Sequence, residues 1–384
     1  RRRRMRETIL TNARVVLSDT VIDGTVVTRG DLITDIAEGR SHLPAALDCE
    51  GGALIPGMIE LHTDNLERHV VPRPETQWPC DAAVLGHDRE IAAAGITTVF
   101  NALCVGEVHS RAARVQLLSE MSDAIEEQLA DGALKAEHFF HWRCEISYSG
   151  MIEILEPLMA HKRLRLLSVM DHTPGQRQFT DLSRYKAYYQ TKFGMSEEEL
   201  NDFIARREEE QRNHSARNRA AVVGFARERG LKLASHDDAT AAHVEEAVQD
   251  GMAIAEFPTT IDSATASHKA GLQVLMGAPN VVRGQSHSGN VSARELGQLG
   301  VLDILSSDYV PGSLLYGALM FEQSAESITL PQAIASVTRN PARAVGLDDR
   351  GEIAIGLRAD LVCFKPTRKA PVIKDVWRGG RKIA

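Results

Sequence analysis

The sequence lacks the long hydrophobic runs of a membrane protein. In its 384 residues, no window approaches the roughly 18 consecutive apolar residues that a membrane-spanning helix requires. The first residues are charged and polar, without the apolar stretch of a secretory signal, so we expect a cytoplasmic protein without a membrane partner. Arg1 to Arg4 precede Met5, which resembles a natural start, and we leave these arginines out of the fold predictions.

Paired cysteines and an excess of positive charge are also missing. The five cysteines form no C-x-x-C pair, and we expect them to be reduced and structural, as in a cytosolic protein. The formal net charge is −8, or −12 without the four N-terminal arginines (−8 − 4). An acidic chain has no general attraction to nucleic acid, so we expect no nucleic-acid partner and a local basic patch for any phosphate-bearing ligand.

Short β-strands are predicted at both ends of the chain. Alternating apolar and polar residues, interrupted by turn sequences such as Asp23-Gly24, fill residues 5–53, and a similar pattern returns in residues 347–384. We expect these two ends to pair in one small β-sandwich domain. Residues 54–346 would then form a single central unit.

The central unit alternates strand-like apolar runs with helical segments, which is typical of parallel strands joined by right-handed crossovers. Eight such strands indicate an α/β fold of the (β/α)8, or TIM-barrel, type. The competing doubly wound sheet lacks support, because no G-x-G-x-x-G fingerprint is present. The predicted strands are 54–62, 96–103, 138–146, 164–172, 231–236, 252–257, 272–278 and 302–308, and helices are predicted at 111–129, 151–161, 215–229 and 241–249.

One connection is much longer than the others. Residues 173–220 form an insertion between the fourth predicted strand and its returning helix. A connection of this length is usually functional or contains helices of its own. We interpret its charge-dense part, residues 197–219, as a solvated helix of mixed charge rather than as a binding element.

Ionisable residues gather at the predicted C-terminal ends of the strands, which form the active face of a TIM barrel. His62 and Asp64 follow the first strand at a spacing that places both on one face, so they can bind one metal ion together. Glu145 is a candidate bridge to a second ion. The remaining ligands of that ion would be His172 and His236.

Asp308, at the end of the eighth strand, is the predicted catalytic residue. It would bind metal and accept a proton from the attacking water. Imidazole and carboxylate ligands suit Zn, Mn, Fe or Ni, so we expect one or two divalent metal ions per chain. Any one of these residues alone would more often be an ordinary core or surface group, but their joint occurrence at successive strand ends favours a metal site.

A Gly- and Ser-rich segment after the seventh strand, residues 277–290, is a candidate phosphate cradle. It offers the donors Arg283, Ser286, His287 and Asn290. TIM barrels often bind phosphate near strands seven and eight. Such a segment alone is more often a simple turn, but Arg177, after the fourth strand, adds a second basic group. Together they indicate an anionic substrate.

Several segments resemble the amidohydrolase superfamily, and the resemblance covers nearly the whole chain. They include residues 56–62 (PGMIELH), 94–99 (AGITTV), 340–344 (NPARA) and 356–362 (GLRADLV). Within the superfamily, the chain is similar to the diphosphatases of the carbon–phosphorus lyase pathway. The similar segments are residues 60–65, 170–179, 235–240, 255–260, 276–280 and 305–309.

The resemblance implies metal-dependent hydrolysis of a small phosphorylated sugar, α-D-ribose 1-methylphosphonate 5-triphosphate, to the 5-phosphate and pyrophosphate. The alternative is a C–N hydrolase, such as a deaminase or cyclic amidohydrolase, which most superfamily members suggest by analogy. A non-catalytic interaction protein would have lost the ligands that this chain retains.

Three positions depart from the superfamily pattern. Many relatives bridge two metals with a carboxylated lysine on the fourth strand, where this chain offers His172, and Glu145 is the expected substitute bridge. Asp64 stands where a second histidine is usual, and the sixth strand ends in Glu256-Phe257 where many relatives carry a histidine.

A homo-oligomer is compatible with the sequence.

Overall fold

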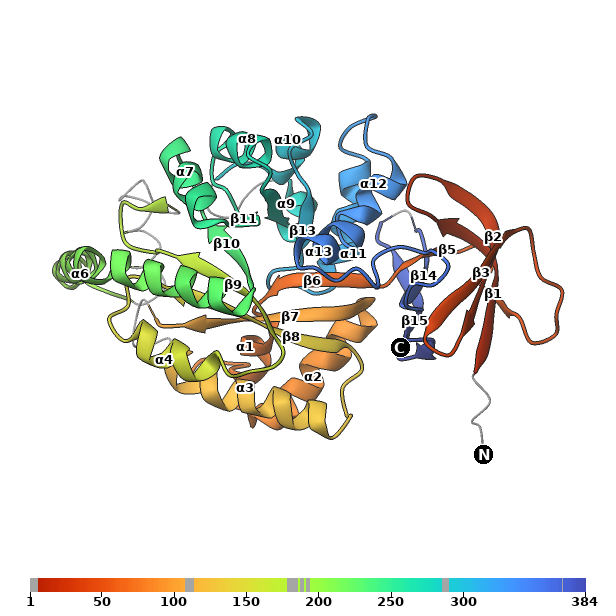
Figure 1. Ribbon diagram of the computed structural model, residues 1–384, viewed down its shortest axis with the longest axis horizontal. Helices are drawn as coiled ribbons and strands as arrows, with labels where there is room; N and C mark the ends of the chain where they lie inside the picture. Colours follow the sequence, from red (N-terminus) through yellow and green to blue (C-terminus); the bar gives the residue numbers. More distant parts are fainter. Residues whose placement is uncertain are drawn as a thin grey trace.

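Eight parallel strands form a barrel at the centre of the molecule (Figure 1). The computed structural model describes residues 6–107, 114–177, 186, 190, 194–284, 290–367 and 369–384. The strands follow one another around the sheet in sequence order, and a parallel bridge between Thr63 and Asp308 joins the last to the first. The predicted (β/α)8 fold is therefore confirmed. Its strands are β6 (Met58–Thr63), β7 (Ile96–Val105), β8 (Glu137–Glu145), β9 (Leu164–Met170), β10 (Lys232–His236), β11 (Ile254–Glu256), β12 (Gln273–Gly277) and β13 (Ile304–Ser306).

Helices cover the outside of this barrel (Figure 1). The four predicted helices correspond to α3, α4, α6 and α7, with shifted ends. Among the described residues, no helix combines the length and apolar character needed to cross a membrane. The described helices are α1 (Asn65–Val70), α2 (Cys80–Ala93), α3 (Arg114–Ala130), α4 (Met151–Leu158), α6 (Glu197–Arg229), α7 (Ala241–Asp250), α8 (Ile261–Lys269), α9 (Ala278–Arg283), α10 (Ala293–Gln298), α11 (Ser313–Glu322), α12 (Leu330–Ala335) and α13 (Arg339–Ala344).

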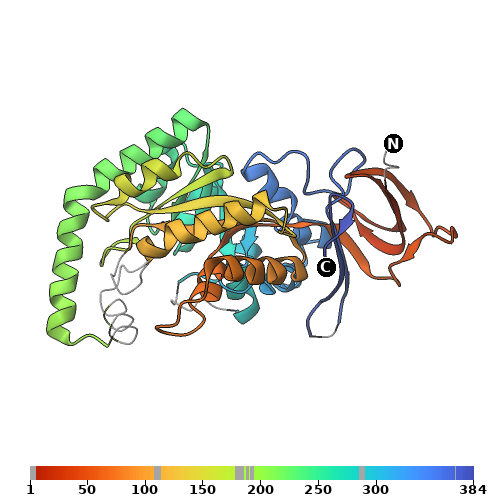
Figure 2. The ribbon, with the colours of Figure 1, turned by 90° about the horizontal axis from the view of Figure 1, so that it is seen from below.

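The long helix α6 begins well before residue 215, where the sequence predicted its start. Ser196 caps its first turn, because the Ser196 hydroxyl accepts from Glu199 N (3.2 Å) and the Glu199 carboxylate accepts from Ser196 N (2.8 Å). Gly230 ends the helix in the left-handed conformation, after 33 residues. The charge-dense segment 197–219 is therefore helical, as predicted, and Figure 2 shows that the first part of α6 extends beyond the barrel. It is not solvated throughout, because Arg207 and Arg219 are buried and pair with carboxylates.

A second sheet combines both ends of the chain, to the right in Figure 1. Its central strand β5 pairs with N-terminal β1 on one side and with C-terminal β14 on the other, where Leu54 lies opposite Cys363. The predicted pairing of the two chain ends is confirmed. The strand order is β16-β15-β14-β5-β1-β2-β3, with β4 beside β1. The strands are β1 (Glu7–Val16), β2 (Val21–Arg29), β3 (Leu32–Glu38), β4 (Leu47–Asp48), β5 (Ala53–Pro56), β14 (Leu361–Lys365), β15 (Val372–Arg378) and β16 (Arg381–Lys382).

The predicted strand 54–62 is divided between the two sheets. Residues up to Pro56 belong to β5 and residues from Met58 onward to β6, so the chain crosses from one sheet to the other at Gly57. A Cβ atom at Gly57 would lie 2.3 Å from Thr97 Oγ1, which leaves no space for a side chain. The backbone N–H of Gly57 donates to Asp360 O at 2.7 Å. A run of apolar residues could not reveal this change of sheet, because both strands are buried.

The inside of the barrel changes from apolar to polar along the strands. The part of the barrel nearer the N-terminal ends of the strands is packed with apolar side chains, among them Ile59, Phe100, Leu166, Ile254 and Ile304. Two residues further along β9, β10 and β11, polar side chains replace them: Ser168, His236 and Glu256. The polar layer therefore lies at the C-terminal ends of the strands, where TIM barrels carry their active sites.

An ion-pair cluster fastens the barrel to the second sheet. Glu137, at the start of β8, accepts hydrogen bonds from Arg350 Nη1 and Arg358 Nη1, each at 2.6 Å. Arg358 also lies 3.3 Å from Asp360, the residue before β14. Burial by itself would raise the pKa of Glu137, but the two guanidinium groups lower it to about 2. The ionised carboxylate is thus strongly preferred in the folded protein.

Replacing Glu137 by glutamine is expected to lower the free energy of unfolding at pH 7 by about 2–3 kcal/mol. Because the pKa of Glu137 is lower in the folded state than its ordinary value of 4.5, its contribution is present above pH 4.5 and is lost as the pH falls toward about 2. Urea unfolding of both proteins from pH 7 down to pH 3 measures this. A difference between the two proteins that stays constant with pH would contradict the role given to the ion pairs.

Candidate metal centre

Three histidines and several carboxylates meet in the polar layer of the barrel. His62 lies on β6, His236 on β10 and Glu256 on β11, and their side chains are at most 6% exposed. The rings of His62 and His236 stack with their centroids 5.7 Å apart. His172 follows β9 and lies 5.7 Å from the His236 ring. The predicted ligands His62, His172 and His236 are thus brought together.

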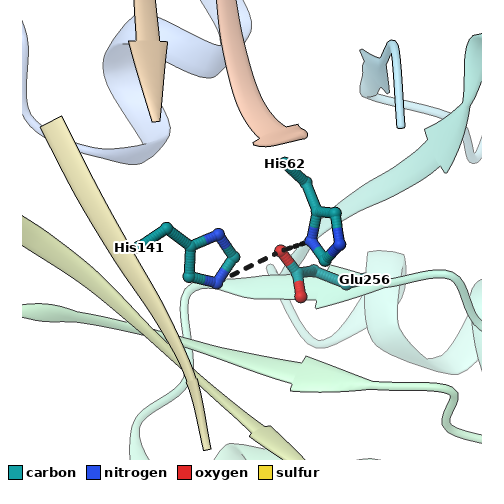
Figure 3. Close-up of side chains that lie close together, drawn as sticks. All are labelled: His62, His141 and Glu256. Carbon is teal, nitrogen blue, oxygen red and sulfur yellow. Dashed lines mark hydrogen bonds and ion pairs between the residues drawn. The ribbon is translucent and has the colours of Figure 1, made fainter. Parts of the chain in front are cut away.

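Glu256 orients two of these histidines. Its Oε1 lies 3.0 Å from His62 Nδ1 and its Oε2 lies 3.1 Å from His236 Nδ1 (Figure 3 shows the first pair). Burial by itself would raise the pKa of Glu256, but His62 foremost, and the hydrogen bond from His236, lower it well below its usual value. An ionised carboxylate only accepts hydrogen bonds, so both Nδ1 atoms carry the proton and both Nε2 atoms keep a free lone pair.

Glu145 holds the third histidine in the same way. Its Oε2 lies 2.6 Å from His172 Nδ1, and its Oε1 accepts from Ser147 Oγ at 2.6 Å. Arg207 of α6 lies 3.6 Å from the same oxygen. Burial would raise the pKa of Glu145, but His172, Arg207 and Ser147 lower it to about 2. The carboxylate is therefore ionised and directs His172 Nε2 toward the centre of the site.

Unpartnered oxygens complete the set of metal-ligand atoms. Asp237 Oδ2 lies 3.5 Å from His236 Nε2 and 3.9 Å from His172 Nε2, and it has no hydrogen bond although it is buried. Asp64 Oδ1 is also buried without a hydrogen bond. A carboxylate–histidine pair that leaves Nε2 free is the usual support of a metal ligand, and buried carboxylate oxygens without partners are costly unless a cation is bound. These residues fit a divalent metal ion.

His141 lies close to the same group but is held differently. Its Nε2 is 3.7 Å from Glu256 Oε1, and Figure 3 shows the two side chains facing each other. However, His141 Nδ1 is 2.9 Å from the Leu61 carbonyl and Nε2 is 2.8 Å from Ser168 Oγ. The carbonyl can only accept, so Nδ1 carries the proton and Nε2 accepts from Ser168. Burial lowers the pKa of His141 to about 3, so this ring stays neutral with both nitrogens engaged.

Asp308 lies where β13 meets β6. Its carbonyl accepts from Thr63 Oγ1 at 2.8 Å, and its N–H donates to Ser306 Oγ at 3.2 Å. Burial and the nearby Asp64 raise the pKa of Asp308 to about 7, against the opposing effect of Arg143. Its φ of 53° is unusual for a non-glycine residue, as are those of Asp237 (56°) and Phe257 (52°) after β10 and β11. Strained backbone at successive strand ends is typical of functional sites.

The structure gives Arg177 two carboxylate partners, whereas the sequence suggested a phosphate contact. Its Nη1 contacts Asp238 Oδ1, and its Nη2 lies 2.9 Å from Glu246 Oε2. Arg219 contacts the same Glu246 oxygen at 3.0 Å. The guanidinium of Arg177 is therefore ion-paired to carboxylates that follow β10, next to Asp237.

The predicted phosphate cradle is only partly described. Arg283 ends α9 and is exposed, and Asn290 is half-buried. Ser286 and His287 lie outside the described residues.

Replacing Arg177 by methionine is expected to lower the free energy of unfolding by about 3 kcal/mol, because it leaves the buried Asp238 without its cation. Urea denaturation measures the loss. The additional change Asp238→Asn should recover part of it, since the uncompensated charge is then gone. The exposed Arg283→Met serves as the control and should stay within about 0.5 kcal/mol of the unmodified protein. An Arg177→Met protein as stable as this control would contradict the ion-pair role.

Comparison with known proteins assigns the chain to a protein family. A model of the amidohydrolase family matches residues 82–384. The chain belongs to the amidohydrolase family. Amidohydrolases generally bind divalent metal ions, in agreement with the ligand atoms described above. Over 380 residues, this amidohydrolase is 46% identical to the α-D-ribose 1-methylphosphonate 5-triphosphate diphosphatase of Escherichia coli K12, covering 98% of this chain and 100% of that protein.

Solved structures of other amidohydrolases share the fold. N-isopropylammelide isopropylaminohydrolase from Burkholderia multivorans superposes with a TM-score of 0.64 at 18% identity, covering 98% of both chains. N-acetylglucosamine-6-phosphate deacetylase from Pasteurella multocida gives a TM-score of 0.61 at 13% identity, covering 98% of this chain and 99% of that one. These similarities concern the fold alone.

Sequence reasoning gives no role to several residues of this amidohydrolase site. Glu256 stands out in the sequence only as a departure from the family pattern, although a carboxylate at a strand end is a usable signal. Asp237 follows His236 directly and is equally visible. Arg207 could not be found from the sequence, because it lies in the middle of a charge-dense helix and only the fold brings it to Glu145.

Proposed function

We propose that this protein is a metal-dependent hydrolase that converts α-D-ribose 1-methylphosphonate 5-triphosphate into the 5-phosphate and pyrophosphate. The observation that carries the metal-dependent chemistry is the pairing of Glu256 and Glu145 with three histidines whose Nε2 atoms stay free. The substrate follows from the 46% identity over the full length of the Escherichia coli diphosphatase. Reaction and substrate thus rest on separate observations.

In this proposal the metal ligands are His62, Asp64, His172, His236 and Asp308. One or two divalent ions, of Zn, Mn, Fe or Ni, bound there would lower the pKa of a water molecule and neutralise phosphate oxygens. The sequence suggested Glu145 as a bridging ligand. Since both oxygens of Glu145 are engaged by other side chains, we assign it, like Glu256, to orienting histidines. Asp237 joins the ligand set because its unpartnered oxygen faces two Nε2 atoms.

Asp308 would accept the proton of the attacking water. Its carboxylate is buried beside Asp64, among the proposed metal ligands, so it would lie next to the water that a bound metal ion activates. Water then adds to the triphosphate, the bond between the α and β phosphates breaks, and pyrophosphate leaves. Arg283, Ser286, His287 and Asn290, in the segment after β12, are the proposed contacts to the phosphate groups.

Phosphorus NMR of the reaction tests this function directly. The metal-loaded enzyme is expected to release one pyrophosphate per molecule of α-D-ribose 1-methylphosphonate 5-triphosphate. Release should stop after chelation, return with added metal, and be absent in a His236→Asn variant. A folded, metal-loaded protein that releases no pyrophosphate would overturn the proposal. Cyclic amides and aminated heterocycles would then test the alternative, a C–N hydrolase.

A further inference from the structure

A row of buried polar side chains runs from the edge of the metal centre to the opposite end of the barrel. This buried polar row consists of Asn65, His87, Asn101, His138 and Asp88, each at most 1% exposed. Its members belong to α1, α2, β7 and β8, so the row lies where α2 packs against the barrel strands. The proposed hydrolysis uses none of them.

The orientation of the Asn65 amide is fixed by its neighbours. Asn65 Nδ2 donates to Glu90 Oε2 at 2.9 Å, and Asn65 Oδ1 accepts from Arg68 Nη1 at 3.3 Å. A carboxylate only accepts and a guanidinium only donates, so the amide cannot be reversed. The second Nδ2 hydrogen therefore points to His87 Nδ1, 3.1 Å away. His87 must accept at Nδ1 and carry its proton on Nε2.

The remaining hydrogen bonds follow in one direction. His87 Nε2 donates to Asn101 Oδ1 at 3.1 Å. Asn101 Nδ2 donates to the Phe139 carbonyl (3.1 Å) and to His138 Nδ1 (3.2 Å). His138 Nε2 then donates to Asp88 Oδ1 at 3.1 Å. Burial lowers the pKa of His87 to about 3, so this ring remains neutral and the direction of the hydrogen bonds is preserved.

The far end of the row is anchored in the backbone. Asp88 accepts from the N–H groups of Lys135 and Ala136, each at 2.9 Å, just before β8 begins. Every polar atom along the row thus has a partner, which rigidifies a buried network.

The near end of the row adjoins one of the strand ends that carry predicted carboxylate ligands, and Arg68 links it to the other. Asn65 directly follows Asp64, whose Oδ1 has no hydrogen bond of its own. Arg68, which donates to Asn65, also donates from the same Nη1 to the carbonyl of Tyr309, the residue after Asp308. Arg68 therefore connects the segments after β6 and after β13, and the Asn65 amide holds this arginine to the row.

We propose that the buried polar row is a positioning element of the metal centre, which holds Asp64 and Asp308 at their spacing from the opposite end of the barrel. The inference rests on the proposed metal-binding role of these two aspartates. Its residues touch neither substrate nor metal. Their loss should therefore weaken metal binding through the altered placement of the ligands, as removal of supporting hydrogen bonds does in other metal sites.

The test is titration of the metal-free protein with Zn²⁺ or Mn²⁺ by calorimetry, together with its thermal unfolding. His87→Leu breaks the row in the middle, and Asn65→Ala removes its near end, so the second variant serves if the first does not fold. His87→Gln restores a donor toward Asn101. His161→Leu is the matched control, because the His161 ring also makes a side-chain hydrogen bond (to Glu126, 3.0 Å) but has none to the row.

We expect His87→Leu and Asn65→Ala to weaken metal binding by about 10- to 100-fold, with His87→Gln and His161→Leu within about threefold of the unmodified protein. If His87→Leu and Asn65→Ala left the metal affinity unchanged, even with a lower melting temperature, the row would have only a structural role. Because no substrate is used, these outcomes are separate from the identity of the substrate. Failure of the unmodified protein to bind either metal would overturn the proposed metal centre itself.

Discussion

Asp308→Asn is expected to lower the rate of pyrophosphate release by about 10³-fold or more while leaving the fold intact. The amide has nearly the same size as the carboxylate, and the main-chain hydrogen bonds of residue 308 to Thr63 and Ser306 do not involve the side chain. The change removes the group that would accept the proton of water, which typically contributes 10²- to 10⁴-fold. It also replaces an anionic ligand by a neutral one. The measurement is kcat at saturating metal, with the circular dichroism spectrum as the check on folding.

Asp303→Asn is the matched control for this variant. Asp303 precedes the same strand at its other end, where it accepts from Val274 N at 2.8 Å and pairs with His268 at 3.0 Å. Its amide should reduce stability slightly and leave kcat unchanged. If Asp308→Asn kept more than a tenth of the activity, Asp308 would not be the catalytic base.

Glu256→Gln is expected to weaken metal binding by about 10- to 100-fold. Glu256 accepts from two histidines at once, and its ionised form fixes the same tautomer in both. An amide offers one oxygen and one NH₂ group, so only one histidine can keep its acceptor. The other ring must turn or change tautomer, which removes a free Nε2 from the site. Calorimetric titration of the metal-free protein measures the change.

Glu126→Gln provides the comparison. Glu126 pairs with His161 on the outer side of the barrel, at 3.0 Å, and 38% of its side chain is exposed. The substitution removes a histidine–carboxylate pair without approaching the metal centre, so metal affinity should remain unchanged. Equal losses in the two variants would show that the effect of Glu256→Gln is general destabilisation.

The sequence predicts the barrel well because its eight strands are apolar runs that alternate with helical segments, and parallel strands put their carboxyl ends on one face. That placement is why His62, His172 and His236 can be grouped from the sequence alone. The change of sheet at Gly57 could not be predicted, since both flanking strands are buried and equally apolar. The pattern of apolar residues indicates which strands are buried, but it does not indicate which sheet a strand joins.

The partners of the charged groups are harder to predict than their positions. Arg177 resembles a phosphate ligand because it follows a ligand-bearing strand, yet Asp238 and Glu246 neutralise it from the next βα unit. Spacing along the chain cannot reveal such a pairing, because it depends on how two loops pack. The carboxylate–histidine pairs share this property: Glu256 lies 194 residues from His62 in sequence, and only the closed barrel brings them together.

The passage of one continuous segment from β5 into β6 also determines when the site can form during synthesis. The strand carrying His62 continues directly from β5, and β5 needs β14 (residues 361–365) as one of its two neighbours. The ribosome makes β14 only after all eight barrel strands have been synthesised. A nascent chain stalled before residue 361 would thus carry every proposed ligand yet leave one edge of β5, the strand that continues into β6, unpaired.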